Sequence, residues 1–296
     1  MTSRGYATST IAQYTFLLHA FDEFLHLRGI SDLRAVQSSD IAAYKAKLMA
    51  RKLSPSTRAQ SLQAVARLFD DLIERGVLLL NPTASVPRLS RKEQPPRKVP
   101  TARAMRQLFD AADTTKRTGI RDRAIVEVLY GSALRVGELC ALVLSDLDLT
   151  GRQLRIRHGK GDRERIVPLT PPAQQWLAEY LRSVRPHWIK RAPTERMLWL
   201  THSAVPLSTG SVRQTLLYLC RKARLKRIGP HTIRHAAATH MLARGADIRH
   251  VQQLLGHQCL ATTQLYTRVA PREVKQTHER THPREQPGAA SNETEP

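Results

Sequence analysis

Residues 152–169 read RQLRIRHGKGDRERIVPL, and this stretch decides the fold class. Leu154 and Ile156 alternate with arginines, GKGD follows, and Ile166 and Val167 resume the apolar pattern. Alternation with a period of two on both sides of a glycine-rich tip is typical of a β-hairpin. The surrounding sequence has helical periodicity. We therefore expect a mainly α protein with one small β-hairpin, an α+β fold.

The sequence around the hairpin predicts a domain of about 180 residues, spanning 101–282. Helices are expected at 102–112, 121–131, 172–184 and 209–223, where apolar residues recur at helical spacing.

The N-terminal part, residues 1–85, is expected to form a separate small helical bundle. Residues 8–28 carry apolar residues at helical spacing, and Ser39-Asp40 is a start signal for a second helix. Ser54-Pro55 combines a cap with a proline in the first turn, and Gly76 ends the helix that follows.

Two segments are expected to lie outside the packed domains. Residues 81–100, NPTASVPRLSRKEQPPRKVP, contain five prolines and five Lys or Arg residues. This composition favours an extended basic linker, with its boundaries at 86 and 100, that either acts as a solvated hinge or crosses a phosphate backbone. Residues 283–296 are rich in Pro, Glu, Asn and Thr, and we expect a disordered tail.

The chain of 296 residues has a net charge of +22 that is spread over both expected domains. Residues 1–99 carry 15 basic and 8 acidic residues, net +7, and residues 100–270 carry 28 and 12, net +16. Such a distribution favours a long polyanion as partner. The alternatives are a merely basic protein or one that binds an anionic membrane surface.

Apolar runs and cysteines indicate the cellular compartment of the protein. No apolar run approaches the roughly 20 residues of a membrane span, and MTSRGYATST lacks the apolar core of a signal peptide. The three cysteines, Cys140, Cys220 and Cys259, are scattered, with no CxxC pair. This pattern fits a reducing cytoplasm and disfavours a cysteine zinc site.

HTIRHAAATH, residues 231–240, has His231 and His235 on one helix face, the spacing of two zinc ligands. However, Arg234 stands beside them, and Thr232 occupies the position where a helical metalloprotease has Glu. His231 and Arg234 fall in the first turn, where free N–H groups attract anions. Anion binding is therefore favoured over metal binding, and His235 and His240 are expected to be structural, hydrogen-bonded residues.

The helix that contains this stretch is bounded by Gly229-Pro230 and Gly245, with Thr232 as the expected cap. Its buried stripe is expected to consist of Ile233, Ala237, Met241 and Leu242.

YGSALRVGELCALVLSDLDL, residues 130–149, is apolar but includes Arg135 and Glu138, three residues apart. A buried arginine requires a partner. Either the two residues form a pair that holds a helix, or Glu138 orients Arg135 toward an anion.

In ADIRHVQQLLGHQCLATTQLYTR, residues 246–268, Asp247 caps a helix that runs through Leu255 and ends at Gly256. His257 follows directly, and Tyr266 lies on a further expected turn. Neither residue alone indicates a function, because most tyrosines are packing residues.

Together these motifs resemble the tyrosine recombinase (phage integrase) family, and most closely its Xer type. The resemblance rests on GSALRVGELCAL, GKGDRERIVPL, HTIRHAAATH, LLGH and TTQLYTRV, in that order, and on LSPSTRAQSLQAVARLFDDLIERG in the N-terminal part. It covers about residues 5–282. It implies a helical DNA-gripping domain and a catalytic domain that form a C-shaped clamp on double-stranded DNA at a specific site.

The resemblance also implies a reaction. Tyr266 matches the nucleophile, which attacks a DNA phosphodiester to give a 3′-phosphotyrosine and a free 5′-hydroxyl. Lys160, in the GKGD tip, matches the general acid that protonates the leaving 5′-oxygen. The phosphotyrosine conserves the energy of the bond that is cut, so no ATP is expected.

The remaining matched residues bind the phosphate. Arg135 and Arg234 match the arginines that hold its non-bridging oxygens, His231 the second-motif His or Lys, and His257 the third-motif His or Trp. Glu138 fits an orienting position next to them. Because positive side chains perform the task of Mg²⁺ in nucleases, no metal is expected.

The chain departs from the family pattern at two places. Ser132-Ala133 stands where the family usually shows Thr-Gly. In Xer-type enzymes a C-terminal helix comparable to APREVKQTHERTHPR, residues 270–284, packs onto a neighbouring subunit. Here Val274 is almost the only aliphatic residue in it, which puts that subunit contact in doubt.

The resemblance favours a site-specific recombinase or integrase that acts as a homo-oligomer, a tetramer on synapsed DNA, with or without a second related recombinase. The alternatives are a topoisomerase IB-like nicking-closing enzyme and a catalytically silent DNA-binding regulator. A silent site would be expected to have lost Tyr266 or an arginine, and both kinds are retained.

Overall fold

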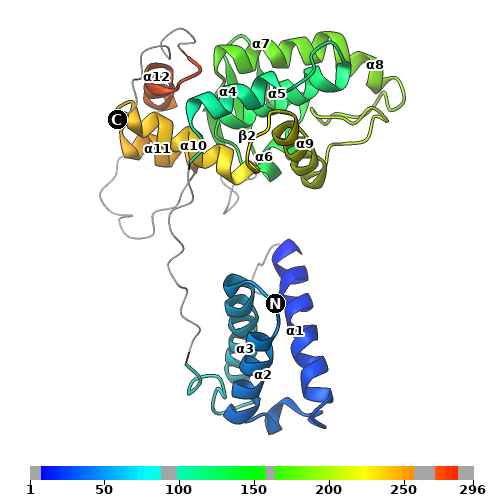
Figure 1. The fold of residues 1–296 in the computed structure, drawn as a ribbon, viewed down its shortest axis with the longest axis vertical. Coiled ribbons are helices and arrows are strands. Elements are labelled where there is room, and N and C mark those ends of the chain that lie inside the picture. Colours follow the sequence, from blue (N-terminus) through cyan, green and yellow to red (C-terminus); the bar gives the residue numbers. More distant parts are fainter. Residues whose placement is uncertain (1–7, 88–98, 158–163, 257–270, 286–296) are drawn as a thin grey trace. The chain divides into compact units, whose positions relative to one another are not determined.

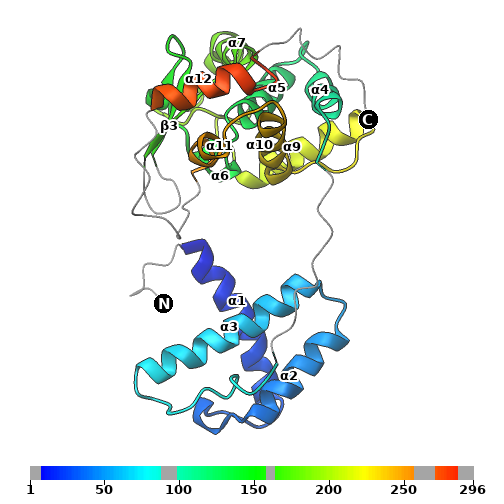
Figure 2. The same ribbon diagram turned by 90° about the vertical axis from the view of Figure 1, so that its left-hand side faces the viewer.

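The computed structural model describes residues 8–87, 99–157, 164–256 and 271–285, and the chain divides into two compact units, Met1–Arg97 and Lys98–Pro296 (Figures 1 and 2). Each unit has a hydrophobic core of its own and is described by itself. The predicted fold class is confirmed, since both units are mainly helical and one small antiparallel sheet is present.

The first unit packs three helices, α1 Thr8–His26, α2 Ser38–Ala50 and α3 Pro55–Glu74, with the short 3₁₀ turn Leu33–Ala35 between the first two. Its core is aromatic, and the ring centroids of Phe21 and Tyr44 lie 4.9 Å apart in an edge-on arrangement. Edge-on pairs of this kind add to the stabilisation from burial. The predicted helix start at Ser54-Pro55 is confirmed, because the Ser54 hydroxyl accepts a hydrogen bond from the Thr57 N–H.

Residues 81–87, which lead into the expected linker 86–100, are packed against the first unit. The Asn81 side chain donates to Asp70 Oδ1 at 2.6 Å and accepts from the Thr83 N–H at 2.8 Å. Lys45 Nζ donates to the carbonyl oxygen of Pro87 at 2.7 Å. The proline content predicted an extended segment, most of which lies outside the described residues. It gave no information about the asparagine that attaches this segment to α3.

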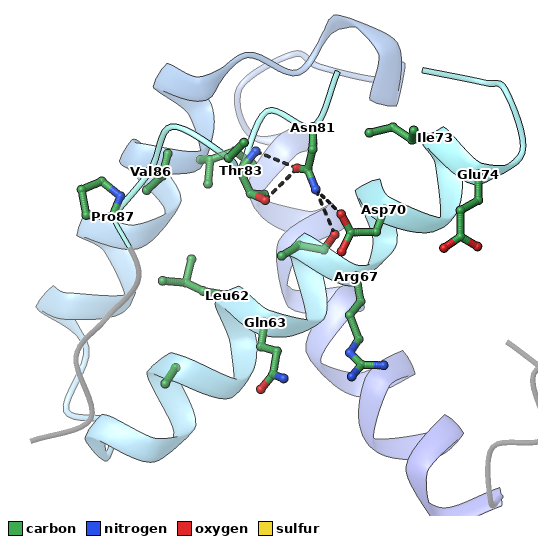
Figure 3. Close-up of a pocket in the computed structure, with 14 residues that line it drawn as sticks. Leu62, Gln63, Arg67, Asp70, Ile73, Glu74, Asn81, Thr83, Val86 and Pro87 are labelled. Atoms are coloured by element: carbon green, nitrogen blue, oxygen red, sulfur yellow. Dashed lines mark hydrogen bonds between the residues drawn. The ribbon is translucent and has the colours of Figure 1, made fainter. Parts of the chain in front are cut away.

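A groove of about 1110 Å³ lies between α3 and this attached segment (Figure 3). Leu62 and Val86 line it with apolar surface, while Arg67, Asp70 and Glu74 line its polar part. None of the site residues expected from the sequence lines this groove.

The second unit is organised around the buried helix α5, Arg117–Gly131, which contacts α4, α7 and α10. Among the described residues, no helix is long and apolar enough to cross a membrane. Besides α5, the α-helices of this unit are α4 Ala102–Asp110, α6 Val136–Ala141, α7 Pro171–Glu179, α8 Arg185–Ile189, α9 Thr209–Lys222, α10 Pro230–Ala243, α11 Ile248–Leu255 and α12 Pro271–Thr281.

The sheet has the order β1-β2-β3 and is antiparallel throughout, with β1 Leu147–Asp148, β2 Gln153–Ile156 and β3 Arg165–Pro168. The two strands of the predicted hairpin are confirmed. The GKGD tip lies outside the described residues. The additional strand β1 has two residues, too few to show an alternating pattern.

The predicted helix 172–184 is interrupted. After α7 the chain forms a π-helix, Tyr180–Val184, and continues as α8. Pro186 lies in the first turn of α8 and has no N–H to donate. A proline cannot donate the regular helical hydrogen bond, which interrupts the α-helix before this residue.

The predicted bounds of helix α10 at Gly229-Pro230 and Gly245 are confirmed, but its cap and one residue of its buried stripe differ from the prediction. Its N-cap is Gly229 and Pro230 takes the first position, so Thr232 is not the cap. Proline suits this place because its fixed φ is helical and its missing N–H would be unpaired anyway. The expected stripe is buried at Ile233, Ala237 and Met241, but Leu242 is 38% exposed, since it lies about 100° around the helix from Met241.

The predicted disordered tail also begins too early, because residues 283–285 are packed against the second unit. Arg284 Nε donates to Glu127 Oε2 at 3.0 Å, and Arg152 Nη1 donates to Glu285 Oε2 at 3.0 Å. Composition suggested disorder, whereas the charged side chains have partners far away in the sequence.

Candidate active site

Arg135 and Glu138 are brought together by the start of α6. Arg135 occupies the N-cap position, with extended backbone angles, and Glu138 is the third residue of the helix. Glu138 Oε2 accepts from the Arg135 backbone N–H at 2.8 Å, and Oε1 accepts from Arg135 Nη1 at 2.8 Å. The carboxylate thus caps the helix and holds the arginine side chain. The helix-holding pair considered from the sequence therefore exists.

Arg165 is a third member of this cluster that the sequence reasoning missed. From the first position of β3, its Nη1 and Nη2 donate to Glu138 Oε1 and Oε2 at 3.0 and 2.9 Å. This two-point contact is the strongest geometry for an arginine–carboxylate pair. A signal was present in the alternating pattern of ERIVPL, but inward orientation of Arg165 depends on packing across the sheet.

Arg234 reaches the same cluster from the second turn of α10. Its Nη1 donates to the Ala133 carbonyl oxygen at 2.8 Å, its Nη2 donates to the Leu255 carbonyl oxygen, and Glu138 Oε2 lies 3.7 Å from Nη1. The side chain is 8% exposed. Burial, together with the neighbouring Arg135, lowers the pKa of Arg234 to about 10. The guanidinium is thus still charged at neutral pH.

The electrostatic balance of the cluster favours an anion. Burial alone would raise the pKa of Glu138, but hydrogen bonds from Arg165 and from the Arg135 backbone reverse this effect, and the pKa is lowered. Glu138 therefore carries its negative charge at neutral pH, and three arginines surround it. The cluster keeps a net positive charge of about two, in a place where side chains are largely shielded from water.

Of the other site residues expected from the sequence, the structure describes only His231. His231 is exposed in the first turn of α10. Lys160, His257 and Tyr266 lie outside the described residues, as do their contacts. By sequence, Lys160 belongs to the connection between β2 and β3, and His257 directly follows Gly256, the last described residue after α11.

Two further histidines of α10 were expected to be structural. His240 Nδ1 shares a hydrogen bond of 2.8 Å with the Tyr130 hydroxyl, as expected. His235 is exposed. In the described part of the chain, no group of three or more His, Cys, Asp or Glu side chains is placed to hold a metal ion.

Two family models match the chain. Residues 98–273 match the phage integrase family, and residues 1–76 match the N-terminal SAM-like domain of phage integrases. The chain therefore belongs to the phage integrase family, whose tyrosine recombinases cut and rejoin DNA strands at specific sites.

Within this family, the curated relatives of the chain include Xer recombinases. Tyrosine recombinase XerC of Listeria welshimeri is 34% identical over 285 residues, covering 96% of this chain and 94% of the relative. Tyrosine recombinase XerC of Bacillus subtilis is 31% identical over 283 residues, covering 95% and 92%. Tyrosine recombinase XerD of Listeria monocytogenes is 32% identical over 286 residues, covering 96% of both chains.

Solved structures agree on the fold. The crystal structure of XerA recombinase is 28% identical, covers 94% of this chain and 93% of its own, and gives a TM-score of 0.50. A lambda integrase dimer bound to a COC′ core site is 18% identical, with coverage of 99% and 76% and a TM-score of 0.65. The Tn1549 transposon integrase with a circular intermediate DNA is 17% identical, with coverage of 86% and 87% and a TM-score of 0.67.

Proposed function

We propose that this site-specific recombinase cuts and rejoins double-stranded DNA through a 3′-phosphotyrosine at Tyr266, with the scissile phosphate held by Arg135 and Arg234. The observation that carries the assignment is the meeting of these two arginines at Glu138, although 98 residues separate Arg135 from Arg234 in the sequence. A buried cluster with excess positive charge suits the charge that develops on a phosphate in the transition state.

The two arginines have donors to spare for a phosphate. A guanidinium has five N–H groups in a planar fork. Arg135 uses one nitrogen for Glu138 and another for the Gly256 carbonyl oxygen, and Arg234 uses two for the Ala133 and Leu255 carbonyl oxygens. The remaining N–H groups of each guanidinium fit the non-bridging phosphate oxygens.

The reaction is an exchange of one ester for another. The Tyr266 oxygen forms a bond to phosphorus and passes its proton to His231, while the bond from phosphorus to the 5′-oxygen breaks. Lys160 supplies a proton to the leaving 5′-oxygen, and His231 and His257 assist at the phosphate. Attack by a 5′-hydroxyl on the phosphotyrosine reverses the step and joins a new strand. No metal or ATP is needed, because the arginines neutralise the charge and the intermediate conserves the bond.

Charge and relatives support the proposed partners. Both parts of the chain are basic, with net charges of +7 and +16, which suits a clamp of two domains on the phosphate backbone. Solved integrases with this fold include a dimer and a tetramer bound to DNA. We propose a homo-oligomer on synapsed DNA, in the cytoplasm where the chromosome lies, with a second related recombinase as a possible addition.

A plasmid assay tests this function and separates strand exchange from simple nicking and closing. The probe is a supercoiled plasmid with two direct copies of the DNA segment that the protein protects next to its own gene. In a buffer with EDTA and no ATP, the wild-type chain should split the plasmid into two circles. Relaxed plasmid without smaller circles would instead indicate topoisomerase-like activity. Protection without any change of the plasmid would indicate a silent regulator.

A further inference from the structure

We propose that Arg165 is a positioning residue, which fixes Glu138 and the end of α11 so that Arg135 and Arg234 present their free N–H groups to the scissile phosphate. This inference rests on the proposed function. It concerns a side chain that the resemblance does not place in the reaction.

The first argument is the contact with Glu138. Arg165 engages both carboxylate oxygens, at 2.9 and 3.0 Å, and Glu138 is almost completely buried. Arg135 engages the same carboxylate from the other side. A buried carboxylate held at two points by Arg165 cannot rotate freely, so the orientation of Arg135 depends on Arg165.

The second argument is the end of α11, where the three arginines share the last carbonyl oxygens. Arg165 Nε donates to Leu254 at 3.3 Å, Arg234 Nη2 donates to Leu255, and Arg135 Nη2 lies 3.5 Å from the Gly256 carbonyl oxygen. The last carbonyl groups of a helix have no partner inside the helix and carry partial negative charge. Arginines from α6, β3 and α10 thus cap one helix end together.

The third argument is the close packing of Arg165 on Gly256. Gly256 ends α11 with φ of +59°, and a Cβ atom built there would lie 3.3 Å from three atoms of the Arg165 guanidinium. This guanidinium therefore lies directly against the last described residue before His257. Arg165 therefore joins Arg135 in contacting both the Glu138 carboxylate and Gly256, the residue that leads by sequence to His257 and Tyr266.

A role in positioning has a specific electrostatic consequence. The charged groups facing Glu138 are Arg135 from α6, Arg165 from β3 and Arg234 from α10. Arg165 supplies the largest of the effects that offset burial and lower the pKa of Glu138. Without Arg165, the pKa of Glu138 is expected to rise, although the hydrogen bonds from Arg135 still oppose the effect of burial. Glu138 then becomes protonated at a higher pH as the solution is acidified.

The experiment measures single-turnover cleavage of a nicked DNA duplex that traps the covalent adduct, for the wild type, Arg165→Ala and Arg165→Lys. We expect cleavage to slow by about 10–100-fold in Arg165→Ala, the usual range for groups that orient a reacting site, with unchanged DNA affinity. Lysine cannot make the two-point contact and should restore only part of the rate. Arg155→Ala is the matched control, because Arg155 is exposed on β2 of the same hairpin.

The pH profile separates positioning from a merely structural or DNA-binding role. The acidic limb of the cleavage rate should move to higher pH in Arg165→Ala and stay in place in Arg155→Ala. Combining Arg165→Ala with Glu138→Gln should remove this shift. Wild-type cleavage rates in Arg165→Ala would overturn the inference, as would lost DNA affinity without a shifted limb.

Two outcomes are distinguished by further controls. If the melting temperature falls in parallel with the rate in both Arg165→Ala and Arg165→Lys, Arg165 serves stability alone and the inference is overturned. If the wild-type chain forms no adduct with any DNA, the proposed function fails instead.

Discussion

His278 Nε2 donates a 2.6 Å hydrogen bond to the carbonyl oxygen of Gly131, which anchors α12 to the end of α5 within one chain. His282 repeats the contact one turn later, with Nε2 donating to the Tyr130 carbonyl oxygen at 3.2 Å. The two imidazole rings stack with centroids 4.6 Å apart. A helix with little aliphatic surface is thus held through polar contacts to buried carbonyl groups.

This anchoring predicts a loss of stability in mild acid. Burial and the neighbouring His278 hold the pKa of His282 well below 6.5, so the native state keeps the imidazole neutral. The unfolded chain binds a proton near pH 6.5, and the native state does not. The stabilisation is therefore fully present above pH 6.5 and is lost as the pH falls below it, by at most about 1.4 kcal/mol per pH unit for one group.

The measurement is the free energy of unfolding of the whole chain between pH 7.5 and 5.5, for the wild type and His282→Gln. Glutamine retains a donor for the Tyr130 carbonyl oxygen but does not titrate. The pH dependence should become shallower in His282→Gln and stay unchanged in His187→Gln, which alters an exposed histidine of α8. Identical slopes in all three proteins would show that His282 does not contribute.

Ala133 adopts a left-handed backbone conformation, with φ of +50°, and its carbonyl oxygen accepts from Arg234 Nη1. This position is where the family usually has glycine. This conformation destabilises the folded state by about 1–2 kcal/mol for an L-residue, and glycine removes that cost. Glycine also raises the conformational entropy of the unfolded chain, which offsets part of the stabilisation. Ala133→Gly should therefore stabilise the protein by about 0.5–1 kcal/mol, measured by denaturant unfolding.

The control is Ala178→Gly, in the last turn of α7, where the helical backbone continues into the π-helix Tyr180–Val184. Here glycine should destabilise by about 1 kcal/mol. If both substitutions destabilise equally, Ala133 carries no strain.

Local signals predicted much of the fold, and long-range contacts account for what was missed. Ser54-Pro55 and Asp247 predicted helix starts because capping is decided within four residues. The attachment of Asn81 to Asp70 and the pairing of Arg284 with Glu127 join residues 11 and 157 positions apart. No periodic pattern or composition contains such pairings, so the sequence did not predict either contact, and residues 283–285 were assigned to the tail.

The candidate site follows the same division. Arg135 and Glu138 share one helix start, so their spacing predicted the pair. The start signal of α10 placed His231 correctly in the first turn, whereas Arg234 lies in the second turn because the helix begins at Pro230. Arg165 was missed because its contact with Glu138 depends on how β3 packs against α6 and α11. The sequence pattern of a strand shows only which residues alternate between its two faces.

Lys160→Ala should slow DNA cleavage by about 10²–10⁴-fold, the usual range for a general acid. The leaving alkoxide needs a proton because its conjugate acid is about as weak as water, with a pKa near 15.7. A thiolate needs far less help, since the pKa of a thiol is about 8.5. Substitution of sulfur for the 5′-bridging oxygen should therefore restore most of the rate in Lys160→Ala.

The same sulfur should not restore Arg234→Ala, because Arg234 acts on the non-bridging oxygens. A defect of Lys160→Ala that is equally large on both substrates would mean that this lysine only contacts the DNA backbone. The general acid would then be another residue.

Tyr266 is expected to become linked to DNA, and covalent trapping on a nicked, end-labelled duplex that carries the protected segment measures this linkage directly. The wild-type chain should yield a protein–DNA band in EDTA, and mass spectrometry of its digest should find the 3′-phosphate on the peptide that contains Tyr266. Tyr266→Phe should bind the duplex with unchanged affinity and give no such band. A band of wild-type intensity from Tyr266→Phe, or a phosphate on another residue, would contradict the account.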